Sequence, residues 1–303
     1  MSTMETFALD PTEVVAAIRD ACLTEIRAFK PGNVSLASPG HGMSARDFIA
    51  SADAMAAVIA VPGASVGRRI LCAIETTRAV VAFNTNLGIV LLCAPLAHAV
   101  VEASGACGLR ARLQAVLAAL DVNDAVLAYQ AIRLAEPGGL GRAERHDVGE
   151  APGVTLLEAM REARERDLIA RQYVTDYRDV FDTGMPALRR ALARWGRPEW
   201  AAVAVYLEFL SRFPDSHVVR KHGLEIAAEV SREAGLLAQT LGRASDPAQE
   251  MPALEAFDRQ LKAKSINPGT SADMTVATLV AMDLEDSLER RFHECSVEVA
   301  TGE

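Results

Sequence analysis

The chain has 303 residues, of which 50% are hydrophobic and only 5% aromatic, and its formal net charge is −9. This alanine-rich composition, with charged residues suited to helix surfaces, favours an all-α fold over a sheet. The acidic balance and the lack of a long basic tract argue against nucleic-acid and membrane partners, but a local basic pocket for a phosphorylated small molecule is still allowed.

Capping boxes predict where the first two helices begin. Asp10-Pro-Thr-Glu13 starts a helix that runs to about Phe29, and the stretch Lys30-Pro-Gly-Asn33 stops it. A polar loop follows, and Ser44-Ala-Arg-Asp47 then caps a second helix, which ends before Pro62-Gly63. A third helix is expected over residues 66–81.

Residues 80–92 are ambiguous, because their β-branched content resembles a buried strand while their length and alanine-rich sequel favour helix–loop–helix. Residues 137–153 hold two Pro-Gly pairs and many charges, so they predict a long loop, and loops of that length are usually functional or disordered. Further helices are expected over residues 109–119, 124–135, 155–177, 186–195, 199–212, 223–241, 252–264 and 273–292. We therefore expect one all-α, multi-helix domain over residues 1–292, with its site on the inter-helix loops. A C-terminal tail follows over residues 293–303, and we expect it to fray from Cys295 onwards.

The cysteines lack C-x-x-C spacing and lie mostly in apolar runs, which predicts reduced core residues in a cytoplasmic protein: Cys22, Cys72, Cys93, Cys107 and Cys295. The N-terminal residues are acidic and contain no apolar segment, so we expect no secretory signal. The longest apolar run, residues 89–101, is too short to span a bilayer.

The stretch from Lys262 to Val280 organises the predicted site. Pro268-Gly269 predicts a tight turn, and Thr270 stands three residues before Asp273, which is the spacing of a capping box. A helix that starts here would offer unpaired backbone N–H groups to a phosphate. Asp273 would repel that phosphate unless a metal or a basic residue lay between them. An ordinary capped helix start is the alternative interpretation.

Three other loops carry polar side chains that are costly to explain as surface. They contain Glu25 with the 30–41 loop, the uncharged island at residues 84–88, and the segment 215–223 with its acid, histidines and cations. Each residue alone has an ordinary explanation, such as a helix cap for Asp215. Together they predict that distant loops surround one shared, negatively charged ligand.

These loops resemble, in the same order, those of the triphosphoribosyl-dephospho-coenzyme A synthase family. The resemblance covers roughly residues 20–285 and rests on five motifs: Lys30-Pro-Gly with Gly40-His41, Asn84-Thr-Asn-Leu-Gly88, Gly138-Gly-Leu-Gly-Arg-Ala-Glu144, Asp215-Ser-His217 through Gly223, and Asn267-Pro-Gly-Thr-Ser-Ala-Asp273. The last motif is the most specific.

The resemblance implies an all-helical transferase with small-molecule nucleotide substrates. Its reaction breaks the N-glycosidic bond of ATP, the co-substrate, releases adenine, and joins triphosphoribose to a hydroxyl of 3′-dephospho-CoA. Catalytic candidates are the carboxylates Asp273, Asp215, Glu144 and Glu25, which suit an oxocarbenium-like transition state and a base for the hydroxyl. Mg²⁺ is inferred for the triphosphate, with Asp215 and Asp273 as its ligands. Substrate- and phosphate-binding candidates are Lys30, Gly32, Asn33, His41, Asn84, Thr85, Asn86, Gly88, His217, Arg220, Lys221, Asn267, Gly269, Thr270 and Ser271.

The chain also departs from the family pattern. Val34-Ser-Leu36 replaces Val-Asp-Arg, the His41 turn lacks an acid, and Asn86-Leu87 replaces His-Lys. These departures imply a changed acceptor, a changed leaving group, or both. A related phosphoribosyl-type transferase in pterin (tetrahydromethanopterin) cofactor biosynthesis and a non-catalytic nucleotide-binding helical protein therefore stay open, as does a homodimer.

Overall fold

The computed structural model describes residues 8–102, 108–139 and 141–301, with side chains to residue 294. Over these ranges the chain forms helices and no strand, which confirms the all-α prediction. The first six helices are α1 (Pro11–Arg27), α2 (Ala45–Ile59), α3 (Val66–Val80), α4 (Leu87–Val101), α5 (Leu109–Ala119) and α6 (Val122–Ala135).

Local capping signals position the N-terminal helices as predicted. Both predicted capping boxes are present, with the Asp10 N–H donating to Glu13 at 3.0 Å and the Ser44 N–H donating to Asp47 at 2.7 Å. Residues 80–92 form helix–loop–helix, since α3 ends and α4 begins within them, so the strand alternative is wrong. All residues of α4 except His98 are buried, which explains its uniformly apolar sequence.

The predicted helix over residues 155–177 is wrong, because the chain breaks it into α7 (Leu156–Ala163) and α8 (Leu168–Val174). Asp167 causes the break: its Oδ1 accepts hydrogen bonds from the N–H groups of Ile169 at 2.9 Å and Ala170 at 3.1 Å. This geometry makes Asp167 the N-cap of a new helix. A π-helical turn (Val180–Gly184), α9 (Met185–Trp195) and α10 (Pro198–Arg212) follow.

The C-terminal third contains α11 (Ser216–His222), which the sequence analysis missed, then α12 (Leu224–Arg243), a 3₁₀ turn (Pro247–Glu250), α13 (Met251–Ala263) and α14 (Gly269–Thr301). The last helix begins at Gly269, one turn earlier than predicted, so Asp273 lies in its second turn and does not cap it. The backbone stays helical to Thr301 and does not fray from Cys295 as expected.

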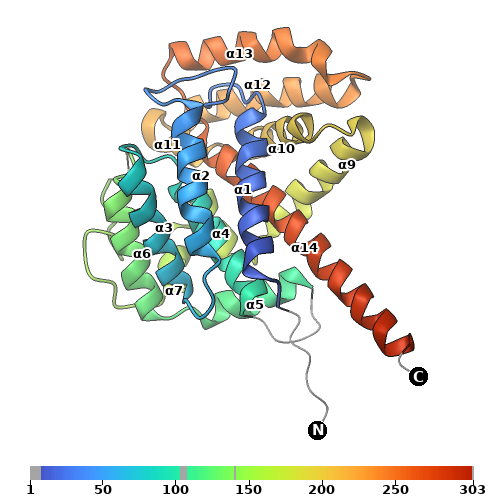
Figure 1. The fold of residues 1–303 in the computed structure, drawn as a ribbon. Coiled ribbons are helices and arrows are strands. Elements are labelled where there is room, and N and C mark those ends of the chain that lie inside the picture. The colour runs from blue at the N-terminus through green and yellow to red at the C-terminus, as the bar shows by residue number, and fades with distance from the viewer. Residues whose placement is uncertain (1–7, 103–107, 140, 302–303) are drawn as a thin grey trace.

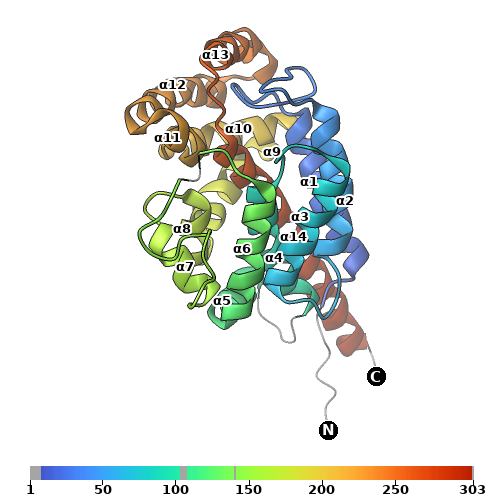
Figure 2. The same ribbon diagram turned by 90° about the vertical axis from the view of Figure 1, so that its left-hand side faces the viewer.

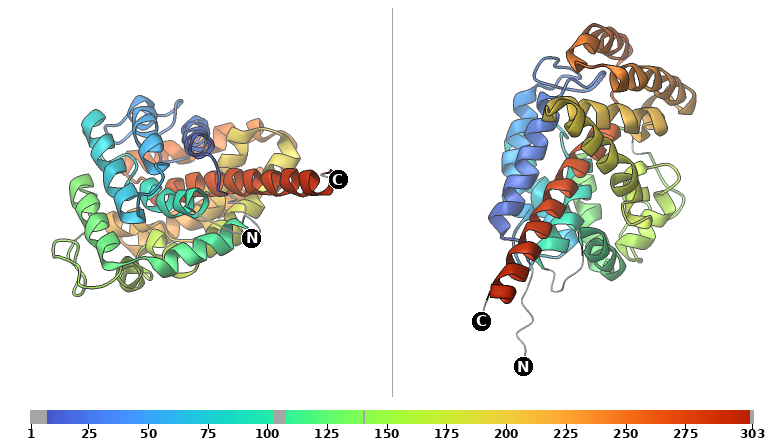
Figure 3. Two further views of the ribbon diagram at one scale, coloured as in Figure 1. Left: turned by 60° about the horizontal axis from the view of Figure 1, so that its bottom comes forward. Right: turned by 90° about the vertical axis from the view of Figure 1, so that its right-hand side faces the viewer.

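Helix α14 is the axis of the molecule. It passes diagonally behind α1 in Figure 1 and packs against α1, α4 and α10, while its C-terminal end extends past the other helices (Figures 1 and 3). A second core lies between α10, α12 and α13 and holds Tyr206, Leu210 and Phe257. In Figure 2, α7 and α8 lie beside α6, with α11 above α8.

Cys22, Cys72 and Cys93 are free thiols, as predicted. Cys107 and the side chain of Cys295 lie outside the described residues. No single described helix has both the length and the apolar character to cross a bilayer, while α5 and α6 would pass such a test only as a pair, which is bent by 95°.

Candidate active site

A cavity of about 470 Å³ opens where the polar loops meet, which is the size of pocket that holds a small organic ligand. Its walls come from the end of α1, the loop before α4, the 137–148 loop, the turn between α7 and α8, and the starts of α11 and α14. The predicted site residues that line it are Glu25, Asn33, Asn84, Thr85, Asn86, Gly88, His217, Arg220, Asn267, Gly269, Thr270 and Asp273. The predicted convergence of distant loops is therefore correct.

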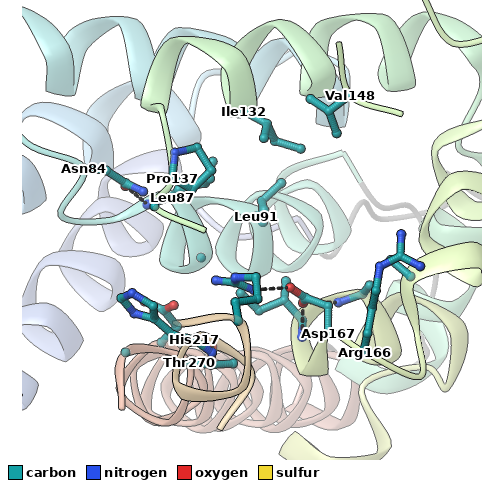
Figure 4. Close-up of a pocket in the computed structure, with 18 of the residues that line it drawn as sticks. Asn84, Leu87, Leu91, Ile132, Pro137, Val148, Arg166, Asp167, His217 and Thr270 are labelled. Atoms are coloured by element: carbon teal, nitrogen blue, oxygen red, sulfur yellow. Dashed lines mark hydrogen bonds and ion pairs between the residues drawn. The ribbon is translucent and has the colours of Figure 1, made fainter. Parts of the chain in front are cut away.

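The cavity has an apolar side and a polar side. Figure 4 shows Ile132, Pro137 and Val148 above, with Leu87 and Leu91 below them. The side chains of His217, Thr270, Asp167 and Arg166 lie along the opposite wall, with His217 and Arg166 at its two ends (Figure 4). A ligand with a ring and a charged chain would find both surfaces here.

Asp273 projects from α14 into this cavity next to the first turn of α4. A Cβ atom at Gly88 would stand 2.0 Å from Asp273 Oδ2, so only glycine leaves room for the carboxylate. Among the described residues, the Asp273 side chain has no hydrogen-bond donor or ion-pair partner. Burial, followed by the charges of Asp215 and Glu25, raises its pKa well above the ordinary value.

Glu25 also lines the cavity, but its charge is balanced by Lys30, which does not line the cavity. Lys30 Nζ lies 3.1 Å from Glu25 Oε1, and the Lys30 side chain is fully buried. The same ammonium donates to the carbonyl oxygens of Glu25 at 2.7 Å and Val34 at 3.0 Å. Lys30 therefore does not reach the cavity as a phosphate ligand, and the prediction of that role is wrong because its donors are already used. Burial raises the pKa of Glu25, and Lys30 opposes this shift.

Asp215 is a structural cap and does not line the cavity. Its Oδ1 accepts from the N–H groups of His217 at 2.9 Å and Val218 at 3.1 Å, which starts α11. Its Oδ2 accepts from the N–H of Ser271 at 2.7 Å and from the Ser271 hydroxyl at 2.8 Å, which starts α14. Four donors occupy this buried carboxylate, so the predicted catalytic and metal-binding roles of Asp215, and the ligand role of Ser271, do not fit the structure.

Of the predicted site residues in the loop after α1, only Asn33 lines the cavity, and Met43 of the same loop lines it as well. Gly32 has a φ of 80° and donates its N–H to Asp258 Oδ1 at 2.8 Å, and its carbonyl oxygen lies 2.8 Å from His41 Nε2. Gly32 and His41 thus stabilise the loop and do not line the cavity, contrary to the binding roles predicted for them. Asn33 Nδ2 donates to Asn267 Oδ1 at 2.8 Å, while Asn33 Oδ1 is buried without a partner.

The polar island before α4 is held from inside the protein. Asn84 Oδ1 accepts the N–H of Leu87 at 3.1 Å, and Asn86 Nδ2 donates to Thr77 Oγ1 at 2.9 Å. The Thr85 hydroxyl bonds to that of Ser51. Asn86 Oδ1 is buried with no partner among the described residues, so the amide has an unused acceptor next to the cavity.

The start of α11 brings His217 and Arg220 to the cavity. Burial and the neighbouring cations Lys221 and Arg220 lower the pKa of His217 to about 3, which makes it a neutral ring at physiological pH. Arg220 NH1 donates to Asp167 Oδ2 at 2.8 Å, while Arg220 Nε is buried and has no hydrogen-bond partner among the residues that the structure describes. The backbone N–H of His217 also donates to Thr270 Oγ1 at 3.2 Å.

Two predicted residues lie outside the cavity on the surface. Glu144 and Lys221 are both exposed, so the structure does not bring Glu144 to the other carboxylates. The prediction instead missed three of the four arginines of the lining, Arg142, Arg145 and Arg166. The first two belong to the long charged loop, which the sequence analysis had marked as functional or disordered without selecting its cations.

The described residues contain no group of three or more histidine, cysteine, aspartate or glutamate side chains that could hold a metal ion. Because Asp215 is saturated by N–H and O–H donors, Asp273 is the member of the predicted pair that still offers open carboxylate oxygens. One carboxylate together with substrate phosphates is a common way to hold Mg²⁺. The site therefore fits a magnesium ion that arrives with a nucleotide better than a preformed metal cage.

A family model described as ATP:dephospho-CoA triphosphoribosyl transferase matches residues 11–292. Among solved structures, the chain is similar to a protein from Archaeoglobus fulgidus proposed to be a triphosphoribosyl-dephospho-CoA synthase, with 24% sequence identity and a TM-score of 0.60. That match covers 78% of this chain and 97% of the other, and it supports the helical fold. No curated protein matches the chain.

Proposed function

Because this chain belongs to the ATP:dephospho-CoA triphosphoribosyl transferase family, we propose that its cavity binds ATP beside 3′-dephospho-CoA and transfers triphosphoribose between them. The C1′–N9 bond of ATP breaks, and a bond forms between C1′ and a hydroxyl oxygen of the acceptor. The proton of that hydroxyl leaves through the enzyme, adenine takes up a proton as it departs, and no redox change occurs.

The observation that carries this proposal is the unpaired carboxyl group of Asp273 in the cavity. Burial, followed by the charges of Asp215 and Glu25, keeps this carboxyl group protonated to a higher pH than usual, although the charge of Arg220 opposes the rise in its pKa. Such a group can donate a proton to a departing base, because the favoured pKa of a catalytic acid lies near the working pH. We therefore assign Asp273 as the acid that protonates adenine.

Glu25 is suited to the complementary role. Its ion pair with Lys30 favours the carboxylate, whereas Asp273 has no such support. Two carboxyl groups whose surroundings differ in this way commonly divide the acid and base roles. We assign Glu25 as the group that stabilises positive charge at C1′ and accepts the proton of the attacking hydroxyl. A proton transfer from Glu25 to Asp273 then restores both groups.

The donor triphosphate is assigned to the α11 side of the cavity. Arg220 supports this placement, because its buried Nε lacks a partner and guanidinium groups bind phosphate oxygens well. Neutral His217 and the Thr270 hydroxyl next to it supply further hydrogen-bonding groups. Mg²⁺ is proposed to enter on the phosphates and to neutralise part of their charge, held by phosphate oxygens and water, because Asp273 is needed in its protonated form as the acid.

The family match favours this transfer over the pterin-pathway enzyme and the non-catalytic nucleotide binder. No contact of the described residues supports either alternative. A homodimer and a cytoplasmic location stay predictions.

The test is product analysis. Purified protein incubated with ATP, Mg²⁺ and 3′-dephospho-CoA should release adenine and form a product whose mass equals that of the acceptor plus triphosphoribose, less one water. A panel of other nucleoside and pterin alcohols serves as the comparison. If no acceptor in the panel leads to adenine release, the proposal is contradicted. If adenine is released only with a pterin alcohol, the pterin-pathway transferase replaces the proposed function.

A further inference from the structure

Three exposed arginines that the proposed reaction does not yet use line the cavity. Arg142 and Arg145 belong to the loop between α6 and α7, and Arg166 lies in the turn between α7 and α8. Figure 4 shows Arg166 at the end opposite His217, with Asp167 between them. Arg145 and Arg166 lie together, because both contact Glu162. We call Arg142, Arg145 and Arg166 the rim arginines, and Arg220 on α11 is the remaining arginine of the lining.

Direct ion pairs engage only one of the rim arginines among the described residues. Arg145 pairs with Glu162 at 2.6 Å, which accounts for one guanidinium and one carboxylate. Arg166 donates only to the carbonyl oxygen of Glu162, at 3.1 Å, and the ion pairs of the described residues include neither Arg166 nor Arg142. Two guanidinium groups thus face the cavity rim without a carboxylate bonded to them.

Of the acidic residues in this loop, only Asp147 lines the cavity. Asp147 lies near Arg142, but its Oδ2 accepts the N–H of Ala143 at 2.6 Å and its Oδ1 accepts the N–H of Gly149 at 2.8 Å. By accepting these two backbone hydrogen bonds, Asp147 stabilises the fold of the loop. Two further bonds fix the loop to α6: the Tyr129 hydroxyl donates to the His146 carbonyl at 2.7 Å, and Arg133 donates to the Val148 carbonyl at 2.6 Å. The loop is thereby held over the cavity.

A reaction between two phosphorylated molecules needs two places for negative charge. The donor carries a triphosphate and the acceptor a diphosphate, and both are bound when the new bond forms. Placing both chains against one set of cations would add repulsion that falls only slowly with distance in a poorly solvated cavity. The site next to Asp273 already contains Arg220, whose charge acts on the Asp273 carboxyl group.

We propose that Arg142, Arg145 and Arg166 form a separate subsite for the diphosphate of the acceptor, while Arg220 serves the triphosphate of the donor. This subsite rests on the proposed function. The apolar wall that faces Asp167 and Arg166, which includes Leu91, Ile132 and Val148, leaves an uncharged surface for the parts of the substrates that carry no phosphate. Arginine suits the diphosphate because its planar fork binds two phosphate oxygens at once.

The test compares the two substrates in one double variant, Arg142→Gln with Arg166→Gln. The KM for 3′-dephospho-CoA should rise by about 10- to 100-fold, as expected for the loss of charge-assisted hydrogen bonds. The KM for ATP should change by less than about threefold. Raising the salt concentration should weaken acceptor binding to the wild type more than to the variant.

Arg161→Gln is the matched control, because Arg161 is exposed on α7 and does not line the cavity. Both KM values should be unchanged in this variant. A double variant that loses affinity for ATP and keeps it for the acceptor would show that the rim arginines bind the donor, which would overturn the subsite. Unchanged KM values for both substrates would also overturn it. A wild type that releases no adenine defeats the proposed function itself, which separates the two failures.

Discussion

The carboxylate of Asp273 lies against Gly88, so that a Cβ atom at residue 88 would stand 2.0 Å from Oδ2 and 2.7 Å from Ile169 Cδ1. The first turn of α4, which contains Gly88, therefore fixes the position of the Asp273 carboxyl group on α14. This contact joins two of the motifs that are far apart in the sequence, and it explains why the polar island before α4 ends in glycine.

Gly88→Ala should lower kcat by about 100-fold, because a displacement of roughly 1 Å at a reacting group has effects of that size. The added methyl group must push the carboxylate out of its place. Steady-state kinetics measure the loss. Gly235→Ala is the control, since a Cβ there would meet Ser211 at an ordinary 3.7 Å and the change should leave kcat unaltered. Wild-type kinetics in Gly88→Ala would show that the position of Asp273 is not critical.

Asp273→Asn should change the pH dependence of stability. The folded protein keeps the Asp273 proton at pH values where the unfolded chain, with a pKa near 3.8, has lost it. Wild-type stability therefore falls as the pH rises from 3.8 through the raised pKa, and asparagine removes this decline. Urea unfolding from about pH 4 to about pH 8 should show the variant gaining stability relative to wild type. A stability difference that does not change with pH would mean that the pKa is not raised.

His217 should stay neutral across the physiological range. Because its pKa is about 3 in the folded protein and near 6.5 when unfolded, the folded state binds fewer protons between these values, and stability is lost as the pH falls through that window. The ring signals, assigned by their disappearance in His217→Asn, should not shift between about pH 5.5 and about pH 8. A titration midpoint near 6.5 would refute the assignment of a desolvated, neutral ring.

Lys30 should matter for stability and not for ATP affinity. Lys30→Met leaves Glu25 buried without its ion pair, which should cost about 3–5 kcal/mol. Adding Glu25→Gln removes the isolated charge and should recover much of that loss. Denaturant unfolding of the single and double variants measures both values. A large rise in the ATP dissociation constant of a folded Lys30→Met protein would instead restore the phosphate-binding role.

Short-range signals in the sequence were enough for most of the fold. The hydrogen bonds between Asp10 and Glu13 and between Ser44 and Asp47 join residues three positions apart, so the local sequence is enough to predict them. The break at Asp167 was missed because no proline or glycine marks it. The start of α14 was misplaced because its cap, Asp215, comes from a residue 56 positions earlier in the chain.

The site was predictable in its loops and less so in its individual side chains. A motif indicates which loop faces a ligand, but the direction of each side chain depends on its tertiary partners. Lys30 turns inward because Glu25 and two carbonyl groups meet it there. The 137–153 loop was recognised as unusual, yet the lining positions of its arginines depend on bonds to Tyr129 and Arg133 in α6.

The most direct measurement is the rate of adenine release from ATP in the presence of Mg²⁺ and 3′-dephospho-CoA, followed by chromatography for the wild type and for Asp273→Asn. If Asp273 donates the proton to adenine, the wild type releases adenine and forms the triphosphoribosyl product, while the variant keeps its helical circular dichroism spectrum and loses at least about 100-fold in rate. Adenine release by the folded variant at the wild-type rate would contradict the account.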